Sequence, residues 1–288
     1  MINIEIIKHR KIFYIISAIV FIAGILSLSI FNLNLGIDFS SGTILEISLN
    51  DEFSTGDIRD VLDNVDLEQE PVIREVGDSG IVQIKTESLS NDKRQNLLDL
   101  LRENYPELVL EKADQVDPVF GQELAKQALF ALVIAIVLMV IYITWRFEFK
   151  FAIAAILALV HDALFVLAIF SIAKIEINSE FIAAILLIIG YSINDTIVIF
   201  DRVRENLKNK KRNQTLAEVV NTSLQQTLRR SIHTSLTTLL AVGAILFFGG
   251  TTLRMFSLAL FLGIISGTYS SIFFASPIWL EWKMKSNK

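Results

Sequence analysis

Long apolar stretches separated by short charged segments are the main feature of the chain. The first stretch, Ile12 to Ile30, contains 19 residues and no charged side chain. At about 1.5 Å per residue, a helix of this length crosses a hydrocarbon core of about 30 Å. Five further apolar stretches follow residue 122, at 124–144, 151–173, 181–200, 231–250 and 255–280. The pattern predicts a membrane α-helical bundle of six spans, with both termini on one side.

A cleaved signal peptide is the alternative interpretation of the first stretch, because the basic segment 8–11 precedes it. The stretch is long for the apolar part of a signal peptide, and no small-residue cleavage pattern follows it. We therefore predict a first span that is retained.

The distribution of Lys and Arg predicts the orientation, because basic residues of short flanking segments stay on the cytoplasmic side during insertion. With the N-terminus inside, the cytoplasmic segments hold 16 Lys and Arg, whereas the two short external loops hold only Lys174 and Arg254. We expect a cytoplasmic N-terminus and the first span at 1–31, an extracytoplasmic domain at 32–122 and a cytoplasmic C-terminal tail at 283–288. The remainder, 123–282, is expected to contain five spans and a basic cytoplasmic loop at 201–228.

The extracytoplasmic segment has its own alternating pattern. The segment 43–49 predicts a strand, and Ser54 to Asp57 predicts the start of a helix. The segments 71–76 and 81–86 predict a hairpin around a turn at 77–80. Ser90 caps a predicted helix, and a last strand is expected from Leu108 to about Lys112. The order β-α-β-β-α-β predicts a ferredoxin-like α+β domain between the first and second spans.

Composition supports the membrane class, since 52% of the residues are hydrophobic and the mean hydropathy is +0.52. There is no Cys, and the three His are scattered, so we expect no disulfide, cofactor or metal site. The net charge of −5 divides into −13 for residues 32–122 and +8 for the rest. So acidic a soluble domain makes nucleic acid an unexpected partner. The sequence also lacks phosphate-loop, metalloprotease and nucleophile motifs, so we expect no catalytic residue and no enzyme activity.

Two carboxyl groups lie where the pattern predicts membrane. Asp162, beside His161, is near the middle of the third span. Asp195, which follows Asn194, lies roughly 9 Å inside the membrane from Asp201 at helical rise. Each such charge costs at least about 2.5 to 3.5 kcal/mol on insertion scales, so each needs a reason to be kept.

A basic residue opens the fifth span from the same cytoplasmic side. Arg230, Thr234 and Thr237 share one helix face at i, i+4 and i+7. His233 lies nearby, and we interpret it as a helix hydrogen-bonding residue.

Two interpretations of these groups remain open. In the first, Asp195 and Arg230 form a proton path, with Asp162 as a second carrier, because protonation changes the attraction between a carboxyl and a guanidinium group. In the second, the polar groups only join helices, at about 0.6 to 2 kcal/mol for each bond. Asp162 then pairs with His161 or with a backbone group.

Small residues form another pattern in the last three spans. They include the small-xxx-small step Gly263 to Gly267, and also Gly190, Ser192 and Ser266. Such residues let membrane helices approach closely, so they predict tight packing here, and sliding surfaces in a transporter core are an equally open interpretation.

The segment 190–206, GYSINDTIVIFDRVREN, resembles the signature of the SecF family of protein translocase subunits, within the SecD/SecF group and the resistance-nodulation-division-like superfamily. The segments 36–43, 117–124 and 227–239 are also similar to family patterns. Two positions depart from them. Ser41 replaces a usual Gly and would be strained at positive φ. His233 stands where the family is often uncharged.

The resemblance implies an auxiliary subunit of the Sec pathway in the cell (inner) membrane. Its implied partners are a SecD-like subunit, the Sec translocation channel, an unfolded secretory polypeptide and the lipid bilayer. It implies that the proton motive force drives late steps of translocation, with Asp195 and Arg230 as the proton-linked pair. A proton-coupled exporter of lipid or small molecules, working alone as a homodimer, and a purely structural assembly factor remain alternatives. Sodium in place of protons also remains open.

Overall fold

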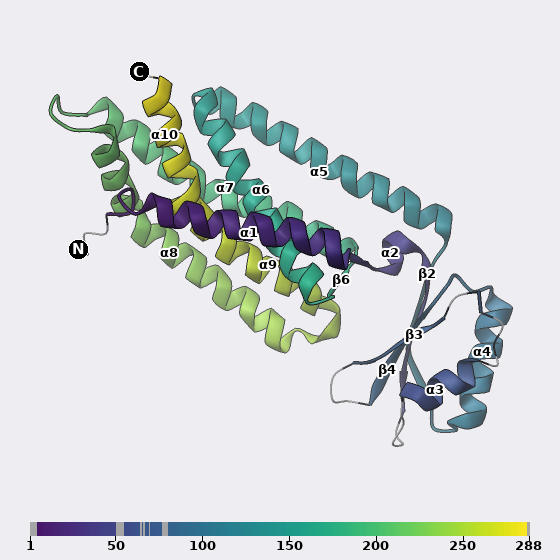
Figure 1. Cartoon of the computed structure of the whole chain (residues 1–288). Coiled ribbons are helices and arrows are strands. Elements are labelled where there is room, and N and C mark those ends of the chain that lie inside the picture. The colour runs from purple at the N-terminus through teal and green to yellow at the C-terminus, as the bar shows by residue number, and fades with distance from the viewer. Residues whose placement is uncertain are drawn as a thin grey trace. The chain divides into compact units, whose positions relative to one another are not determined.

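The computed structural model describes residues 5–49, 55–63, 65, 67, 68, 70–76 and 80–286. The chain divides into two compact units. The helical unit comprises residues 1–34 and 130–288, and the α/β unit comprises residues 35–129. Figure 1 shows the elements of both units, and each unit is described by itself.

The helical unit is built from long apolar helices. Its elements are α1 (Arg10–Phe31), α6 (Phe149–Ile172), β6 (Glu176–Ile177), α7 (Ser179–Lys208), α8 (Leu216–Phe248), α9 (Gly250–Ser270), the π-helix η1 (Ser271–Ala275) and α10 (Ser276–Ser286). The helix α5 (Pro118–Arg146) begins in the α/β unit and ends in the helical unit.

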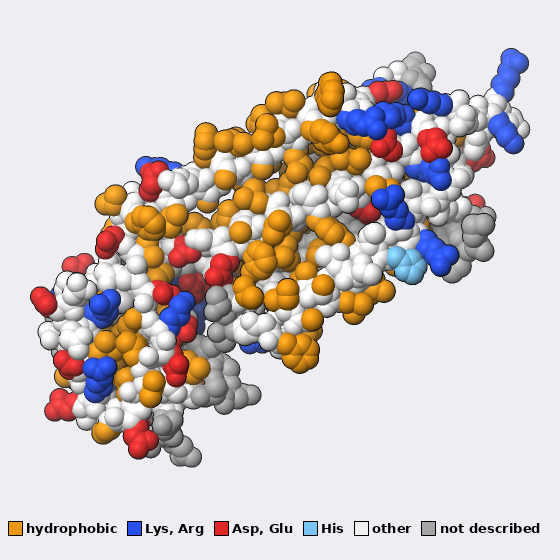
Figure 2. Space-filling model, turned by 180° about the vertical axis from the view of Figure 1, so that it is seen from behind, with side chains coloured by type: hydrophobic (Ala, Val, Ile, Leu, Met, Phe, Trp, Pro, Cys, Tyr) orange, Lys and Arg blue, Asp and Glu red, His pale blue; other side chains and the backbone are white. Residues whose placement is uncertain are grey.

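Six helical segments of the described chain are long and apolar enough to cross a membrane. They are Arg10–Phe31, Pro118–Arg146, Phe149–Ile172, Ser179–Lys208, Leu216–Phe248 and Leu253–Ser286. Figure 2 shows hydrophobic side chains covering the helices on one face, with Lys and Arg gathered at one end of them. The six predicted spans are therefore confirmed as helices of suitable length and composition.

Helix α9 packs against α6, α7 and α8, and α1 lies along α6. The inner face of α6 is rich in buried alanine, which permits close approach. The tightest point lies between α9 and α7, where a Cβ added at Gly263 would come within 2.3 Å of the Ile188 side chain. Only glycine fits at this position without movement of the neighbour.

Two features of the helices differ from the hydrophobic pattern. Helix α7 continues to Lys208 and α8 begins at Leu216, so much of the predicted loop 201–228 is helical. Charged residues remain helical outside the membrane, and Thr215 with Glu218 forms a capping box at the start of α8.

The last span is also interrupted by η1. Pro277 has no N–H to donate to the carbonyl four residues earlier, and the π turn lies just before it. The hydrophobic pattern carries no signal for this irregularity.

The α/β unit contains a four-stranded sheet and two main helices. Its elements are β1 (Asn34–Leu35) at its boundary, α2 (Ile37–Ser40), β2 (Gly42–Ser48), α3 (Thr55–Leu62), β3 (Val72–Val76), β4 (Ile81–Thr86), α4 (Asn91–Asn104) and β5 (Val109–Val116). The sheet order is β3-β4-β2-β5, and every neighbouring pair is antiparallel.

The core of this unit lies between the sheet and α3 and α4. Leu45 and Ile47 of β2 pair in register with Ile84 and Val82 of β4. These side chains are buried together with Ile58, Leu62, Leu97, Leu98 and Leu101 from the two helices. The predicted helix start at Ser54 and the turn at 77–79 lie outside the described residues.

Two local features of the α/β unit were not predicted in detail. Strand β5 extends to Val116, beyond the predicted end near Lys112, because its exposed polar side chains hide the alternation. Ser41 follows the short helix α2 with φ +60° and ψ 167°, a conformation that glycine adopts more readily.

Candidate functional site

The polar residues at membrane depth form two groups in the helical unit. One surrounds Asp162 on α6, and the other surrounds Asp195 on α7. They use different neighbours, so they are described in turn.

The Asp162 carboxylate is 1% exposed and is surrounded by hydroxyl groups. Its Oδ2 accepts hydrogen bonds from Ser192 at 2.6 Å and from Ser270 at 2.9 Å. Its Oδ1 accepts one from Ser266 at 2.7 Å and lies 3.3 Å from Nδ1 of His161. We call Ser192, Ser266 and Ser270 the serine cage. It joins α6 to α7 and α9 through one charged group.

A second layer of hydroxyl groups lies beside the cage. Thr196 Oγ1 lies 2.8 Å from Ser271 Oγ, which belongs to η1. Each hydroxyl also lies within hydrogen-bonding distance of the carbonyl of Ser192, at 3.2 and 3.3 Å, so one hydroxyl can donate to that carbonyl while the other donates across the pair. A Cβ at Gly267 would lie 3.0 Å from the Ser192 side chain, so the small residue at 267 lets α9 reach α7 here.

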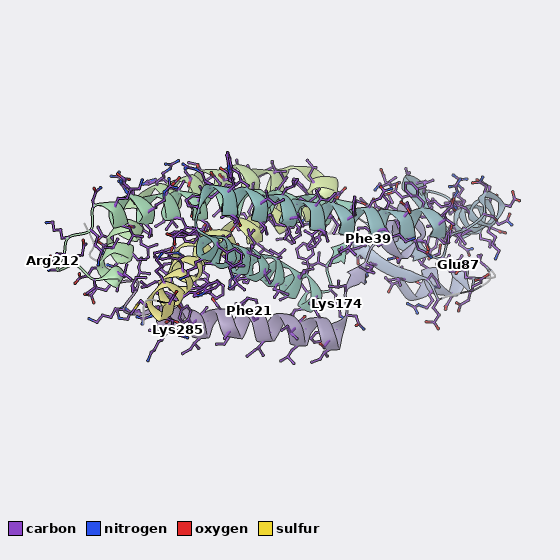
Figure 3. The ribbon with its side chains drawn as sticks, turned by 90° about the horizontal axis from the view of Figure 1, so that it is seen from above. Phe21, Phe39, Glu87, Lys174, Arg212 and Lys285 are labelled. Atoms are coloured by element: carbon purple, nitrogen blue, oxygen red, sulfur yellow. The ribbon has the colours of Figure 1, made fainter. Side chains whose placement is uncertain are left out.

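His161 is buried in an aromatic surrounding. Its ring stacks with Tyr269 at a centroid distance of 5.7 Å and lies 5.2 Å from Phe274. Phe21, labelled on α1 in Figure 3, meets it edge-on at 5.5 Å. Nε2 of His161 is buried and has no hydrogen-bond partner among the described residues.

Asp195 has fewer partners than Asp162. Its Oδ1 accepts a hydrogen bond of 2.6 Å from Ser231 on α8, whereas its buried Oδ2 has no partner in the described chain. Arg230 is the residue before Ser231, but its side chain is exposed. No ion pair within 4.0 Å joins Asp195 to Arg230 in the part of the chain that the structure describes. The two predicted residues therefore lie near each other through Ser231 and without a direct salt bridge.

The other predicted residues lie on an open face of α7 and α8. Asn194, Arg230, Thr234 and Thr237 all have exposed side chains. Both threonine hydroxyls donate to backbone carbonyls of their own helix. The Thr234 hydroxyl donates to the carbonyl of Arg230, and the Thr237 hydroxyl donates to the carbonyl of Thr234, each at 2.9 Å. We call these four residues the polar face.

The structure thus brings Asp195 to Ser231, near the middle of α8, and Asp162 to His161, but it puts the two carboxylates in separate groups. Sequence analysis noted Ser192 and Ser266 only as small residues and missed Ser231 and Ser270. The i, i+4 spacing of Ser266 and Ser270 on one face of α9 is the signal that could have indicated them. Groups of three or more metal-ligating side chains are absent from the described residues.

Ion pairs lie at one end of the helical unit. Asp201 pairs with Arg204 at 3.2 Å and with Arg146 at 3.7 Å, and Lys283 pairs with Glu148 at 2.7 Å. Figure 3 shows Arg212 and Lys285 at this end and Lys174 at the other end of the helical unit. Basic residues therefore concentrate at one end of the helices.

Comparison with known protein families gives two matches. Residues 96–285 match the family described as protein export membrane protein SecD/SecF, C-terminal. Residues 26–51 match the SecD/SecF GG motif.

Curated relatives cover nearly the whole chain. The protein translocase subunit SecF of Alicyclobacillus acidocaldarius is 39% identical over 99% of this chain and 94% of that protein. SecF of Acidaminococcus fermentans is 41% identical over 98% of both chains. The subunit SecDF of Bacillus subtilis is 41% identical over 98% of this chain, which spans 38% of that longer protein.

A solved structure is similar as well. The crystal structure of SecDF from Thermus thermophilus, described as a translocon-associated membrane protein, matches 98% of this chain with a TM-score of 0.90 and 34% identity. The chain spans 39% of that structure. These likenesses fit a multi-pass membrane protein and favour the translocase hypothesis over the exporter hypothesis.

Proposed function

The chain belongs to the SecD/SecF family of protein export membrane proteins, and we propose that it is an auxiliary subunit of the Sec machinery that works with a SecD-like partner. The pair uses the proton motive force to drive late steps in which an unfolded polypeptide crosses the inner membrane beside the Sec channel. Relatives named translocase subunits support this role. The greater length of SecDF supports the partner, since this chain spans only 38% of the Bacillus protein.

The observation that carries the proposal is the incomplete bonding of Asp195. One of its carboxylate oxygens has the Ser231 hydroxyl as donor, and the other is buried without a described partner. A buried unpaired oxygen is costly when charged, and a proton placed on it removes that charge. Asp195 is therefore suited to gain and lose a proton when neighbouring groups move.

The polar face supports the need for a partner. Asn194, Arg230 and the two threonines are exposed in this chain at a depth where lipid would surround them. Charged side chains in membranes face protein or a water-filled cavity. We propose that a second set of spans covers this face and brings acidic or polar groups to Arg230. His161, Asn194, Thr234 and Thr237 then line or flank the path.

The α/β unit is proposed to be a ferredoxin-like domain on the extracytoplasmic side. The element order β2-α3-β3-β4-α4-β5 and the antiparallel sheet order support this fold. The orientation is supported by the basic residues gathered at one end of the helical unit, around Arg212 and Lys285, which would be cytoplasmic. Both termini are then cytoplasmic.

The decisive experiment replaces Asp195 by Asn, which keeps the size of the side chain and removes its charge and proton exchange. We expect Asp195→Asn to insert and to co-purify with the partner, while gradient-dependent export falls to the level of cells lacking the chain. Export measured against pH at fixed sodium, and against sodium at fixed pH, identifies the ion. Unchanged export in a complementation assay would contradict the proposal.

Asp201→Asn is the matched control. It removes the same charge from the same helix, but at an end where Asp201 forms partly exposed ion pairs with Arg204 and Arg146. Such pairs contribute about 0 to 1 kcal/mol, so we expect export to remain within about twofold of wild type.

A further inference from the structure

The two carboxyl groups of the helical unit have opposite hydrogen-bonding states. Asp162 accepts three serine hydroxyls and also contacts His161, whereas Asp195 accepts one hydroxyl and has a buried oxygen with no described partner. We propose that Asp162 is a positioning residue, and that its serine cage fixes the turn of α7 that carries Asp195. This proposal rests on the proposed proton-exchanging role of Asp195 and assigns Asp162 a different one.

The cage makes Asp162 the shared acceptor of three helices' polar groups. Three hydroxyl donors converge here on its two oxygen atoms. Removing this acceptor would leave at least two of the hydroxyls without a partner. Among the described contacts, Ser192 and Ser266 have no other acceptor for their hydroxyls, and a buried donor without an acceptor is costly. Only Ser270 has an alternative, the carbonyl of Gly267 at 3.3 Å.

The cage is joined directly to the helical turn of Asp195. Ser192 lies three residues before Asp195, and Thr196 lies one residue after it. Ser192 is held by Asp162, while Thr196 is held by Ser271 of the π-helix. The inner side of this turn is thus bonded to α6 and η1, and Asp195 extends toward Ser231 on α8.

The seam between α7 and α9 leaves little room for adjustment. Gly263 and Gly267 approach Ile188 and Ser192 so closely that a Cβ at either position would lie 3.0 Å or less from them. A π-helix is uncommon and is found frequently at functional sites, and η1 supplies the Ser271 hydroxyl at this point. The cage bonds and the tight seam together hold the turn of α7 that carries Asp195. We therefore expect the loss of one cage bond to change where Asp195 lies relative to Ser231.

Three ionisable groups are shown near the two carboxylates among the described residues. They are His161, which lies 3.3 Å from Asp162, Tyr269, which stacks with His161, and Arg230, which lies near Asp195. None of these three is altered by a serine substitution in the cage. A change in pH dependence after such a substitution would come from Asp195 or from Asp162, and the second experiment separates the two.

The first experiment compares serine-to-alanine variants of α9 in membrane vesicles that carry the chain with its partner. Ser266→Ala and Ser270→Ala each remove one donor to Asp162. We expect the midpoint of the pH profile of gradient-dependent export to move by about half a unit or more, a threefold change in proton occupancy. Ser257→Ala is the control, because Ser257 is a buried serine of α9 whose hydroxyl has no described partner. We expect it to keep the wild-type profile.

Co-purification with the partner tests whether each variant folds. If Ser266→Ala and Ser270→Ala give the wild-type profile while Asp195→Asn abolishes export, the positioning role is wrong and the proposed function stands. If Asp195→Asn exports normally, the proposed function itself fails.

A second experiment follows protonation directly and does not depend on the alanine variants. Infrared difference spectra of the wild-type complex are recorded between about pH 6 and 8, where solvent-exposed carboxylates stay ionised. We expect Asp195→Asn to remove part of the protonated-carboxyl band, and we expect Asp162→Asn to leave any band contributed by acidic groups of the partner unchanged. A remaining band in Asp195→Asn that disappears in the double variant with Asp162→Asn would overturn the proposal, because Asp162 would then exchange protons.

Discussion

Asp162 and Asp195 show how the surroundings of a residue separate two identical side chains. Both are aspartates in apolar helices, and the insertion cost predicts a role for each. Three serine hydroxyls around Asp162 make it a junction of α6, α7 and α9, whereas the single hydroxyl at Asp195 leaves one oxygen free to take a proton. The number of donors, rather than the residue type, distinguishes the two proposed roles.

Ser41 gives a prediction about stability at this scale. Its φ of +60° with extended ψ belongs to a region that is almost restricted to glycine, where other residues cost about 1 to 3 kcal/mol. Glycine loses more chain entropy on folding, which offsets part of that gain. We expect Ser41→Gly to raise the unfolding free energy of the α/β unit by about 1 kcal/mol, measured by hydrogen exchange in β2 of the full chain.

Ser40→Gly is the matched control, because Ser40 is the last residue of the short helix α2. Glycine is unfavourable in a helix, so this variant should lose about 0.5 to 1 kcal/mol. Equal protection of β2 in Ser41→Gly and wild type would show that the positive φ carries no net cost.

The sequence could indicate the candidate carboxylates but not their partners. Asp162 and Asp195 are conspicuous because charges are rare in apolar stretches. Serine is common in membrane helices, and hydroxyls such as those of Thr234 and Thr237 bond to their own helix. Which serine reaches across to another helix depends on rotation and separation, which a single hydrophobic pattern does not determine. Ser231 and Ser270 were missed for this reason.

At the scale of elements, close packing of α7 and α9 explains the glycine at position 263. A Cβ there would meet Ile188 side-chain atoms at 2.3 Å, so Gly263→Ala requires the Ile188 side chain or one of the two helices to move. Overpacking of this kind costs about 1 to 3 kcal/mol. We expect Gly263→Ala to lower the thermal unfolding midpoint of the full chain in detergent.

Two further variants test this explanation. Ile188→Ala makes room for the added methyl group, so it should cost less in the Gly263→Ala background than in wild type. Gly190→Ala adds a methyl group where no atom lies within 4 Å, and it should leave the midpoint unchanged or raise it slightly. Equal effects of the alanines at 190 and 263 would indicate that helix propensity, and not packing, determines the result.

The elements also show where prediction from hydrophobicity ends. Apolar stretches identified all six spans because the membrane requires long uninterrupted helices. The helical extensions Asp201–Lys208 and Leu216–Leu228 are polar outside the membrane, so apolar length does not detect them. The π turn at Ser271–Ala275 is as apolar as its flanks, and only Pro277 indicates an irregularity there.

At the scale of the whole molecule, the helical unit has an inner packed group and helices that are little buried. Helices α6, α7 and α9 with η1 contain the Asp162 junction, while α5 and α8 expose much of their length. Lipid suits the apolar side chains of α5. Contact with lipid is unfavourable for the polar face formed by Asn194, Arg230, Thr234 and Thr237. The exposure of this face is the strongest indication in the helical unit that the chain does not work alone.

The polar face leads to a prediction that the absence of natural cysteine makes easy to test. A single cysteine at Thr237, on α8, should react with a small thiol reagent when the chain is produced alone. Co-production with the SecD-like partner should reduce labelling several-fold, because the partner covers this position. Lys211→Cys, in the segment between α7 and α8, is the control, because Lys211 is exposed outside the apolar spans and should react equally in both cases. Equal labelling of Thr237→Cys with and without a co-purifying partner would mean that another part of the chain receives the partner, and Arg230 would then need a water-filled cavity to remain charged in the membrane.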